Sequence, residues 1–387
     1  MVELRIFRGE ENMSETGLNM SRRIRRTPYT DRVEAHGVRG FSVVNHMLLP
    51  KAFAPTVEDD YWHLRENVQI WDVSCQRQVE ITGPDASKLV QSMTPRDLRK
   101  AQFGQGLYIP LIDDAAGMLN DPVLQKLDND RFWLSIADSD ILLWAKGLAY
   151  GMRLDVQIEE PDVSPLAVQG PKAIALMANL FGHKIHDLPY FGFAMFDILG
   201  TRQIIARSGY SKQGGFEIYL QGGHLGTALW DMIWEEGQKY NIAPGCPNLI
   251  ERIEGGLMSY GNEFTRANNP LECGFGPLCH LGSEIDYIGK TALQRIANIG
   301  PTQRLSGVRF GGGKAPPCGK PFPLTTLDGE EVGQITSGIF SPRFDCNIGL
   351  SMIARSHWDI GTSLMVHTPD GIARRASVAA LPFTHDG

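Results

Sequence analysis

The chain has 387 residues, of which 42% are hydrophobic and 21% are charged. These values are typical of a globular protein that is long enough for two or three domains. Lys and Arg total 37 and Asp and Glu total 44, which gives a net charge of −7 and no basic excess for nucleic-acid binding. No apolar run is long enough to cross a bilayer. We therefore expect small-molecule partners, with no nucleic acid and no membrane.

The cysteine pattern and the N-terminal residues bear on location. None of the six cysteines lies in a C-x-x-C pair, and no charged-then-apolar leader pattern opens the chain. These features predict a location in the reducing cytoplasm. The first 20 residues are polar and lack periodicity, and Met13 and Met20 offer alternative starts. We expect residues 1–20 to be a disordered tail or an over-extended start.

Strand and helix patterns alternate along the chain. Residues 79–82, 132–136 and 154–158 are rich in β-branched and aromatic side chains, which favours strands. Apolar residues recur at helical spacing in three other segments. Asp138 and Ser139 can cap the first, Pro171 and Gly182 bound the second, and Gly237 ends the third. This mixture predicts an α+β fold.

The composition changes near residue 300. A short amphipathic helix is expected at residues 288–296, and the chain beyond it is strand-like and rich in turns. We predict that residues 302–387 form a small all-β domain, a barrel, after a larger region at residues 21–298.

Several well-known motifs are missing from the sequence. Gly274 and Gly276 are followed by Pro277, so they do not start a dinucleotide-binding helix. Lys314 is followed by Ala315 where a P-loop needs Ser or Thr. There is no G-x-S-x-G or H-E-x-x-H motif and no zinc-like spacing of His and Cys. We therefore expect no metal and no phosphate-binding loop.

The segment 209–219 is the most informative stretch of the chain. Its two adjacent glycines, Gly214 and Gly215, can adopt the positive φ of a tight hairpin turn. The strand pattern that follows places Glu217 and Tyr219 on one face. A carboxylate beside aromatic rings suits a flat heterocycle with adjacent N–H donors, such as a pterin. A solvated surface hairpin would show the same pattern.

Six short motifs together resemble the T-protein family of tetrahydrofolate-dependent one-carbon transferases, which includes the glycine-cleavage aminomethyltransferase. Each motif alone is weak, but all six occur in the family's order, and the resemblance extends from about residue 22 to the C-terminus. It implies a T-protein-like fold in which residues 21–298 form two intertwined α+β subdomains that bind tetrahydrofolate. The motifs lie at residues 71–74, 166–171, 209–219, 252–254, 287–290 and 336–342.

Some positions depart from the aminomethyltransferase pattern. Cys75 and Gln76 stand where glycine-cleavage proteins have His-Met, and an acidic pair is replaced by Asn120 and Asp121. Residues 40–50 and 120–123 are similar to the branch of the family that demethylates dimethylsulfoniopropionate. Cys75 is expected to be a buried thiol without a catalytic role.

The resemblance implies a methyltransferase that moves a methyl group from the sulfonium of dimethylsulfoniopropionate to N5 of tetrahydrofolate. The products would be methylmercaptopropionate and 5-methyltetrahydrofolate. An aminomethyltransferase or amine demethylase, acting on a glycine-cleavage or dimethylglycine-like donor, is an alternative. So is a folate-binding protein without catalysis. A homodimer is possible.

The same resemblance assigns four cofactor-binding residues. Glu217 would accept hydrogen bonds from the pterin edge, and Tyr108 and Tyr210 would flank the cofactor. Arg252 would meet a carboxylate of folate or substrate, unless it pairs with a nearby acid such as Glu254.

Three further residues are expected at the reacting end of the site. Asp121 would act as the catalytic residue near N5 and N10 of folate, and a plain turn role is its alternative. Tyr219 and Ser135 are expected to bind the substrate, because an aromatic face attracts a sulfonium and a hydroxyl can bind a carboxylate.

Overall fold

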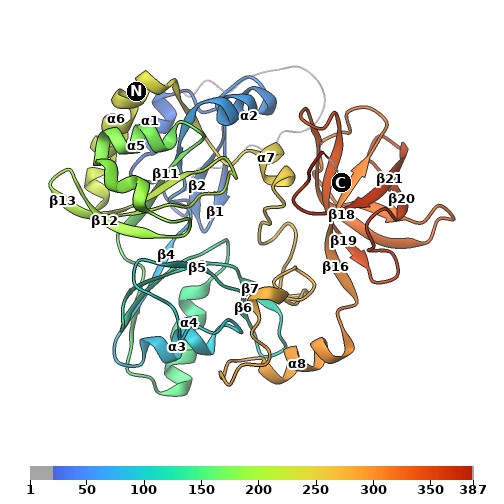
Figure 1. Cartoon of the computed structure of the whole chain (residues 1–387), viewed down its shortest axis with the longest axis horizontal. Helices are drawn as coiled ribbons and strands as arrows, with labels where there is room; N and C mark the ends of the chain where they lie inside the picture. Colours follow the sequence, from blue (N-terminus) through green and yellow to red (C-terminus); the bar gives the residue numbers. More distant parts are fainter. Residues whose placement is uncertain (1–20, 386–387) are drawn as a thin grey trace.

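The computed structural model describes residues 21–385, so the predicted tail at residues 1–20 lies outside the described residues. The described chain forms three lobes (Figure 1), one built on a mixed six-stranded sheet, one on an antiparallel five-stranded sheet and the third on a barrel. Among the described residues the α-helices are α1 (Thr30–Ala35), α2 (Val57–Glu66), α3 (Ala86–Ser92), α4 (Ile141–Met152), α5 (Ala173–Phe181), α6 (Gly226–Gly237), α7 (Leu249–Glu254) and α8 (Lys290–Ile299).

A six-stranded sheet forms the core of the first lobe. Its order is β12-β13-β14-β11-β3-β15, and only the β15–β3 pair is parallel. Helices α5 and α6 cover one face, where Met177 and Trp230 pack against Ile218. The strands are β3 (Val68–Asp72), β11 (Val163–Gln169), β12 (Phe193–Ile198), β13 (Thr201–Ala206), β14 (Gly215–Gln221) and β15 (Ile242–Gly245), with the β1 (Gly40–Val44) and β2 (Met47–Ala52) hairpin beside them.

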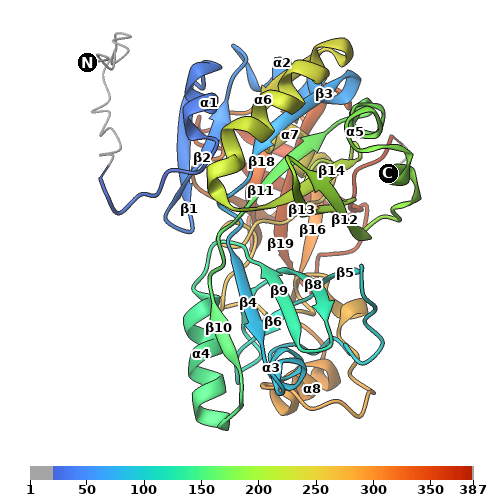
Figure 2. The ribbon, with the colours of Figure 1, turned by 90° about the vertical axis from the view of Figure 1, so that its left-hand side faces the viewer.

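A five-stranded antiparallel sheet forms the second lobe, below the first in Figure 2. One face packs on α3 and α4, with Leu89 and Ala145 against Leu124 and Leu134. The strands are β4 (Gln78–Thr82), β5 (Gly106–Tyr108), β8 (Val123–Asp128), β9 (Arg131–Ser135) and β10 (Gln157–Glu159), in the order β10-β4-β9-β8-β5. The small pair β6 (Leu111–Ile112) and β7 (Met118–Asn120) lies next to this sheet in the chain.

Each of the two sheets has one face that no helix covers, and these two faces pack against each other. Trp133 on β9 and Tyr219 on β14 belong to one buried cluster, with ring centroids 6.3 Å apart. Alternation along β14 sends Tyr219 toward this contact while Phe216 and Ile218 point into the helix-covered core. The predicted division of that strand's faces is therefore confirmed.

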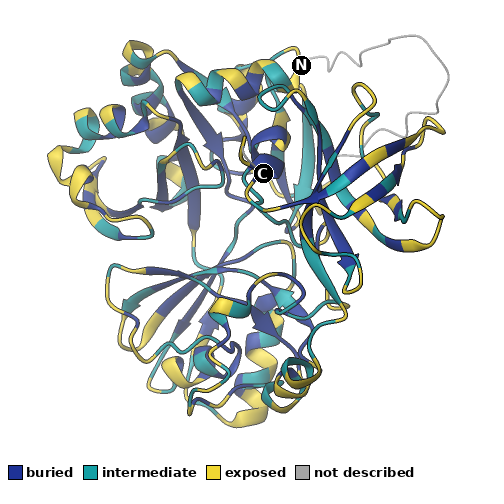
Figure 3. Cartoon of the chain, turned by 45° about the vertical axis from the view of Figure 1, so that its right-hand side comes forward, coloured by how far each residue is buried: buried dark blue, intermediate teal, exposed yellow. Residues whose placement is uncertain are grey.

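The third lobe is a closed antiparallel barrel. Its strands are β16 (Gln303–Phe310), β17 (Phe322–Thr325), β18 (Glu331–Ser341), β19 (Cys346–Ala354), β20 (Ser363–His367) and β21 (Ala373–Ala379), in the order β16-β19-β18-β17-β20-β21. In all three lobes the strands carry most of the buried residues, whereas exposed residues gather on outer helices and loops (Figure 3). The α+β fold with a C-terminal barrel is as predicted. The domain limits 21–298 and 302–387 stay a prediction.

Three local expectations differ from the structure. Asp138 and Ser139 do not cap α4, because Asp138 accepts a hydrogen bond from the Asn45 backbone and Ser139 donates to the Leu119 carbonyl. The strand expected at residues 154–158 is only three residues long and shifted to Gln157–Glu159. Residues 207–214 form an eight-residue loop between β13 and β14 rather than a tight hairpin, although Gly214 and Gly215 do have positive φ.

None of the six cysteines, all of which lie in the described part, forms a disulfide. Cys75 is buried, as expected, and burial raises the pKa of its thiol. No helix between residues 21 and 385 is long and apolar enough to cross a membrane. A cytoplasmic location and a homodimer stay predictions.

Candidate active site

Asp121 lies at the turn between β7 and β8, and its carboxylate has two different environments. Oδ2 accepts a short hydrogen bond from the phenol of Tyr108, while Oδ1 is buried and has no hydrogen-bond partner among the described residues. Burial raises the pKa of Asp121 to about 7, although the hydrogen bond from Tyr108 opposes this shift. The carboxyl group can therefore hold or release a proton near neutral pH.

Asn120 fixes the backbone on which Asp121 sits. Its side-chain oxygen accepts hydrogen bonds from the Asp121 and Ala137 amides, both at 3.0 Å. Its side-chain nitrogen donates to the Ala137 carbonyl at 3.1 Å and to Ser139 Oγ at 2.7 Å. Asn120 thus gives a fully bonded, neutral support for the backbone at Asp121.

Tyr210 and Arg252 meet on the segment that follows α7. The phenol of Tyr210 donates to the Met258 carbonyl and, at 3.2 Å, to the Leu257 carbonyl. Arg252 donates to the same Leu257 carbonyl at 3.1 Å. Burial is the main cause of the raised pKa of Tyr210; the charges of Glu263 and Asp121 raise it further, and Arg252 opposes the shift.

The guanidinium of Arg252 is committed to protein partners. It pairs with Glu263 at 2.7 Å and donates to Ser337 Oγ on the barrel at 2.6 Å. Burial, the largest single effect, favours its neutral form, but Glu263 and Tyr210 together outweigh it and the pKa of Arg252 is raised. The ion pair that was the alternative to ligand binding does exist, with Glu263 instead of Glu254. Glu254 accepts hydrogen bonds from Tyr61 and Ser341.

Glu217, Tyr219 and Ser135 form a second, buried group between the two sheets. Ser208 donates a short hydrogen bond to Glu217, and the Tyr219 hydroxyl lies 3.5 Å from the same carboxylate oxygen. Burial raises the pKa of Glu217, and these two hydroxyls partly offset it. Burial and the charge of Glu217 hold the pKa of Tyr219 well above its usual value, while Ser135 is close enough to lower it slightly.

The loop that carries Tyr210 is held by the amide of Gln169. Its nitrogen donates to the Ser208 carbonyl at 3.1 Å and its oxygen accepts from Ser211 Oγ at 2.7 Å. This amide lies so close to Gly209 that a Cβ there would be 2.0 Å from its oxygen. Position 209 therefore requires glycine because the Gln169 side chain packs against its backbone, and not because of a tight turn.

The structure thus brings the seven predicted site residues together in two groups. Tyr108, Asp121, Tyr210 and Arg252 form the first, and Ser135, Glu217 and Tyr219 form the second. Within residues 21–385 no side-chain hydrogen bond joins the groups. Strand β8 connects them, because Val123, two residues after Asp121, pairs with Ser135 on β9. Tyr108, Asp121 and Tyr210 are partly exposed, whereas the second group is buried.

Sequence reasoning missed several polar residues at this location. Ser208 and Glu263 hold predicted site residues, and Gln78, Gln125 and Trp133 lie on the strand faces beside Ser135. Gln78 and Gln125 could have been suspected because a glutamine on the buried face of a strand is unusual. It could be recognised only once the strand faces were known.

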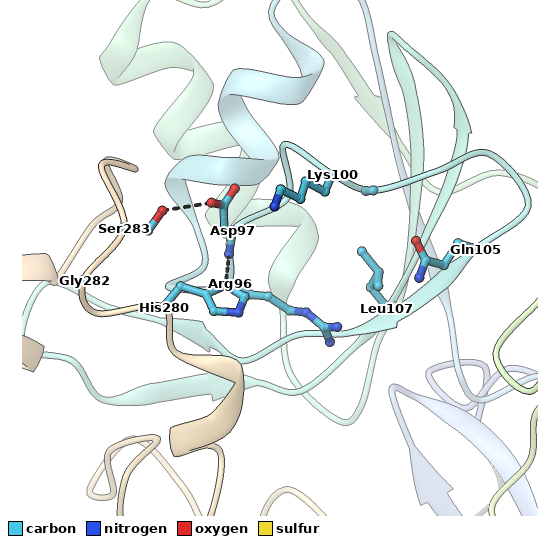
Figure 4. Close-up of a pocket in the computed structure, with 9 residues that line it drawn as sticks. Arg96, Asp97, Lys100, Gln105, Leu107, His280, Gly282 and Ser283 are labelled. Carbon is cyan, nitrogen blue, oxygen red and sulfur yellow. Dashed lines mark hydrogen bonds between the residues drawn. The ribbon is translucent and has the colours of Figure 1, made fainter.

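A separate cavity of about 550 Å³ lies outside both groups, between the loop before β5 and residues 280–283 (Figure 4). Its polar lining includes Arg96, Lys100 and Gln105, and Arg96 donates to the Tyr108 carbonyl at 2.5 Å. Asp97 bonds to His280 and Ser283 across its edge. None of the predicted site residues lines this cavity.

Comparison with known proteins agrees with this architecture. Residues 29–283 match the GCVT N-terminal domain, and residues 304–384 match the glycine cleavage T-protein C-terminal barrel domain. The crystal structure of the glycine cleavage system aminomethyltransferase T from Bartonella henselae superposes with a TM-score of 0.82 at 23% identity, covering 94% of this chain and 98% of that one. The fold is therefore that of an aminomethyltransferase T-protein.

Two named relatives cover most of the chain. A dimethylsulfoniopropionate demethylase of Ruegeria pomeroyi is 49% identical over 352 residues, which are 91% of this chain and 95% of that protein. An aminomethyltransferase of Symbiobacterium thermophilum is 30% identical over 347 residues, 87% of this chain and 91% of that protein. This chain belongs to the glycine cleavage T-protein family, as its six ordered motifs indicated.

Proposed function

We propose that this protein is a tetrahydrofolate-dependent methyltransferase that demethylates dimethylsulfoniopropionate to methylmercaptopropionate. The observation that carries the proposal is the 49% identity to a dimethylsulfoniopropionate demethylase over nearly the whole of both chains, against 30% to an aminomethyltransferase. The departures at Cys75 and Asn120 favour the same branch.

The donor atoms of the site fit a reduced folate. Glu217 is a buried carboxylate whose bonded partners are two hydroxyl groups, with no cation among them, so it can still accept hydrogen bonds from the N–H groups of a pterin edge. Tyr108 is hydrogen-bonded to Asp121, and Tyr210 is within the electrostatic range of the same carboxylate, so the two rings would flank a planar ligand there. Tetrahydrofolate would supply the nucleophilic N5 that receives the methyl group.

In the transfer, the methyl C–S bond breaks with its electron pair remaining on sulfur, and the carbon bonds to nitrogen. A neutral thioether leaves, and the proton of the attacking amine is released. The protein's contribution is to hold the two reactants in line, which is worth roughly 7–11 kcal/mol when orientation is ideal. Asp121 would stabilise the positive charge that develops on the amine and accept the released proton, since its pKa is about 7.

Arg252 has a positioning role in this proposal. Its hydrogen bonds with Glu263, Ser337 and the Leu257 carbonyl order the segment on which the Tyr210 hydroxyl rests. The contact of Arg252 with a folate carboxylate, expected from the resemblance, would use a donor left free by these partners.

The decisive experiment is to incubate the purified protein with tetrahydrofolate and dimethylsulfoniopropionate and to follow 5-methyltetrahydrofolate by mass spectrometry. Dimethylglycine serves as the amine donor in a parallel reaction. We expect product with the sulfonium only. Product with the amine only would establish the aminomethyltransferase alternative, and folate binding with no turnover of either donor would indicate a non-catalytic folate-binding protein.

A further inference from the structure

The β1–β2 hairpin belongs to the first lobe and reaches toward the second (Figure 2). Asn45 and His46 form its turn, between the paired residues Val44 and Met47, and both have positive φ, 50° and 62°. A type I′ turn requires positive φ at both positions and favours Asn there. The side chain of His46 is exposed, whereas Asn45 is only 4% exposed. The buried amide of Asn45 therefore calls for hydrogen-bond partners.

Asn45 finds these partners at the junction of the two lobes. Its side-chain nitrogen donates to the Cys75 carbonyl at 2.9 Å and to the Ala137 carbonyl at 3.1 Å, and its backbone amide donates to Asp138 at 2.7 Å. Cys75 lies in the connection from β3 of the first lobe to β4 of the second, and residues 136–140 link β9 to α4 within the second lobe. Asn45 thus ties the hairpin of the first lobe to the second lobe.

The segment that Asn45 contacts is also the support of Asn120. The amide of Ala137 donates to Asn120 Oδ1 at 3.0 Å, and the carbonyl of Ala137 accepts from Asn120 Nδ2 at 3.1 Å. Asn45 and Asn120 therefore donate to the same carbonyl. Asn120 Oδ1 in turn accepts from the backbone amide of Asp121. An unbroken series of hydrogen bonds runs from the hairpin turn to the backbone of Asp121.

The two groups of the candidate site are carried by different lobes. Glu217 is on β14 and Tyr210 in the loop before it, both in the first lobe, whereas Tyr108 and Asp121 belong to the second. Folate held at Glu217 must therefore present N5 at a fixed distance from Asp121. A misplacement of about 1 Å can cost on the order of 100-fold in rate. The reaction thus depends on how the two lobes are placed relative to each other.

We propose that Asn45 is a positioning residue for methyl transfer. Its side chain holds residues 137–139, and these residues hold Asn120 and thereby the carboxylate of Asp121. The hairpin of the first lobe in this way sets the place of Asp121 relative to folate bound on the same lobe. The inference rests on the proposed function and gives Asn45 no contact with substrate or cofactor.

The test variant is Asn45→Gly. Glycine adopts positive φ without strain, so the turn and the backbone bond to Asp138 are kept and only the side-chain bonds are lost. His46→Gly is the matched control, because it introduces the same flexibility at the next position of the same turn and removes an exposed side chain. Melting temperature, calorimetric folate binding and methyl transfer from dimethylsulfoniopropionate are measured for each protein, the last below the melting temperature.

A second control, Asn347→Ala, removes an equally buried amide far from the site. Asn347 is on β19 of the barrel and is 1% exposed. Its side chain donates to the Gly313 carbonyl at 2.6 Å and accepts from the Ala315 amide at 2.9 Å. This variant therefore shows what the loss of a buried, bonded asparagine costs in stability alone.

We expect Asn45→Gly to lower kcat by about tenfold or more and to leave folate affinity within about twofold of the wild type, since Glu217 and Tyr210 stay in place. His46→Gly should keep the wild-type kcat. Asn347→Ala should lower the melting temperature without changing kcat. Asn45→Asp keeps the turn and the shape of the side chain but replaces the donating nitrogen by an oxygen, so it should lose at least as much activity as Asn45→Gly.

The pH profile separates positioning from a loss of stability. Burial keeps the pKa of Asp121 at about 7, and a looser turn should admit water to this carboxylate. The rise of kcat/KM with pH should therefore move to lower pH in Asn45→Gly and stay in place in both controls. These three substitutions leave the titratable groups that face Asp121 unchanged. The groups are Tyr108 on β5, Tyr210 in the loop before β14, and Tyr260, Glu263 and Cys273 after α7.

A wild-type kcat and an unshifted pH profile in Asn45→Gly would overturn the positioning role while the methyltransferase function stands. A parallel loss of folate affinity and kcat would also overturn it, because Asn45 would then support the whole site. Full activity in Asn45→Asp would show that the donated hydrogen bonds are not needed. A wild-type protein that transfers no methyl group from dimethylsulfoniopropionate would overturn the proposed function, and this inference with it.

Discussion

The phenol of Tyr108 donates a hydrogen bond to one oxygen of Asp121, and the other oxygen of that carboxylate is buried without a partner in the part of the chain that the structure describes. Tyr108 ends β5 and Asp121 lies two residues before the start of β8, and these strands pair with Tyr108 opposite Val123. The contact is therefore set by strand register and leaves one acceptor of Asp121 for a ligand.

Asp121→Asn is expected to reduce methyl transfer by on the order of 100-fold, because the amide cannot accept a proton or stabilise positive charge. In the wild type, kcat/KM should rise with pH through about 7, the pKa of the buried carboxyl group. The variant should lose this rise. Initial rates between pH 5.5 and 8.5 check both points, and a rise near pH 7 that persists in the variant would assign it to another group.

The same substitution should change the pH dependence of stability. The folded pKa of Asp121 is raised, so the carboxyl group favours folding below its unfolded pKa of about 4, and this contribution is lost as the pH rises through about 7. At pH 8 the wild type holds a buried charge that Asn lacks. Asp121→Asn should then be more stable in urea unfolding by up to about 4 kcal/mol, with a smaller difference at pH 5. A difference independent of pH would contradict the raised pKa.

Glu217→Gln is expected to weaken tetrahydrofolate binding by about 1.5–3 kcal/mol, the usual loss for hydrogen bonds to a charged group. Calorimetric titration measures the change. Glu254→Gln is the matched control, since Glu254 is also a buried carboxylate that accepts hydrogen bonds from hydroxyl groups, those of Tyr61 and Ser341. Equal affinities for the wild type and Glu217→Gln would remove Glu217 from the folate site.

Local pattern was sufficient for much of the fold. Period-2 alternation at residues 216–219 predicted the two faces of β14 correctly, because one face packs under α5 and α6 and the other meets the second sheet. Gly182 and Gly237 do lie at the ends of α5 and α6. The caps expected for α4 were wrong because Asp138 bonds to Asn45, which is 93 residues away in the chain.

The contacts within the site also depend on residues that are far apart in the chain, and local sequence pattern does not predict them. The family resemblance indicated Tyr108, Asp121 and Glu217 one by one, but nothing in the sequence indicates that Gln125 and Trp133 are opposite each other on neighbouring strands. The partner of Arg252 depended on tertiary structure as well. Glu254 is nearer in sequence, whereas Glu263 is reached because the chain folds back after α7.

Arg252→Met should destabilise the protein by about 3–5 kcal/mol, since it leaves the carboxylate of Glu263 buried without its cation. The side chains of the pair are 8% and 0% exposed. Arg202→Met is the control, because Arg202 and Asp197 form an exposed pair that is expected to contribute about 0–1 kcal/mol. Urea unfolding of both variants provides the comparison. Equal, small losses would show that the Arg252 network does not hold the barrel and the Tyr210 segment together.

Comparing Gly209→Ala with Gly214→Ala distinguishes the cost of backbone strain from the cost of a steric clash in the loop beside Glu217. Both glycines have positive φ, but a Cβ at 214 meets nothing within 4 Å, whereas one at 209 would lie 2.0 Å from the Gln169 amide oxygen. Gly214→Ala should therefore cost about 1–2 kcal/mol. Gly209→Ala should cost more, because Gln169 must leave its hydrogen bonds to the Ser208 carbonyl and Ser211.

The two variants should also differ in ligand binding. Gln169 holds Ser208, which donates a hydrogen bond to Glu217 and lies two residues before Tyr210. Displacing Gln169 should therefore disturb Glu217 and Tyr210, the two predicted folate-binding residues nearest to it. Tetrahydrofolate affinity measured by calorimetry below the melting temperature of each variant is expected to fall in Gly209→Ala and to be retained in Gly214→Ala. Full affinity in Gly209→Ala would mean that the loop can move away from Gln169 without disturbing the contacts of Glu217.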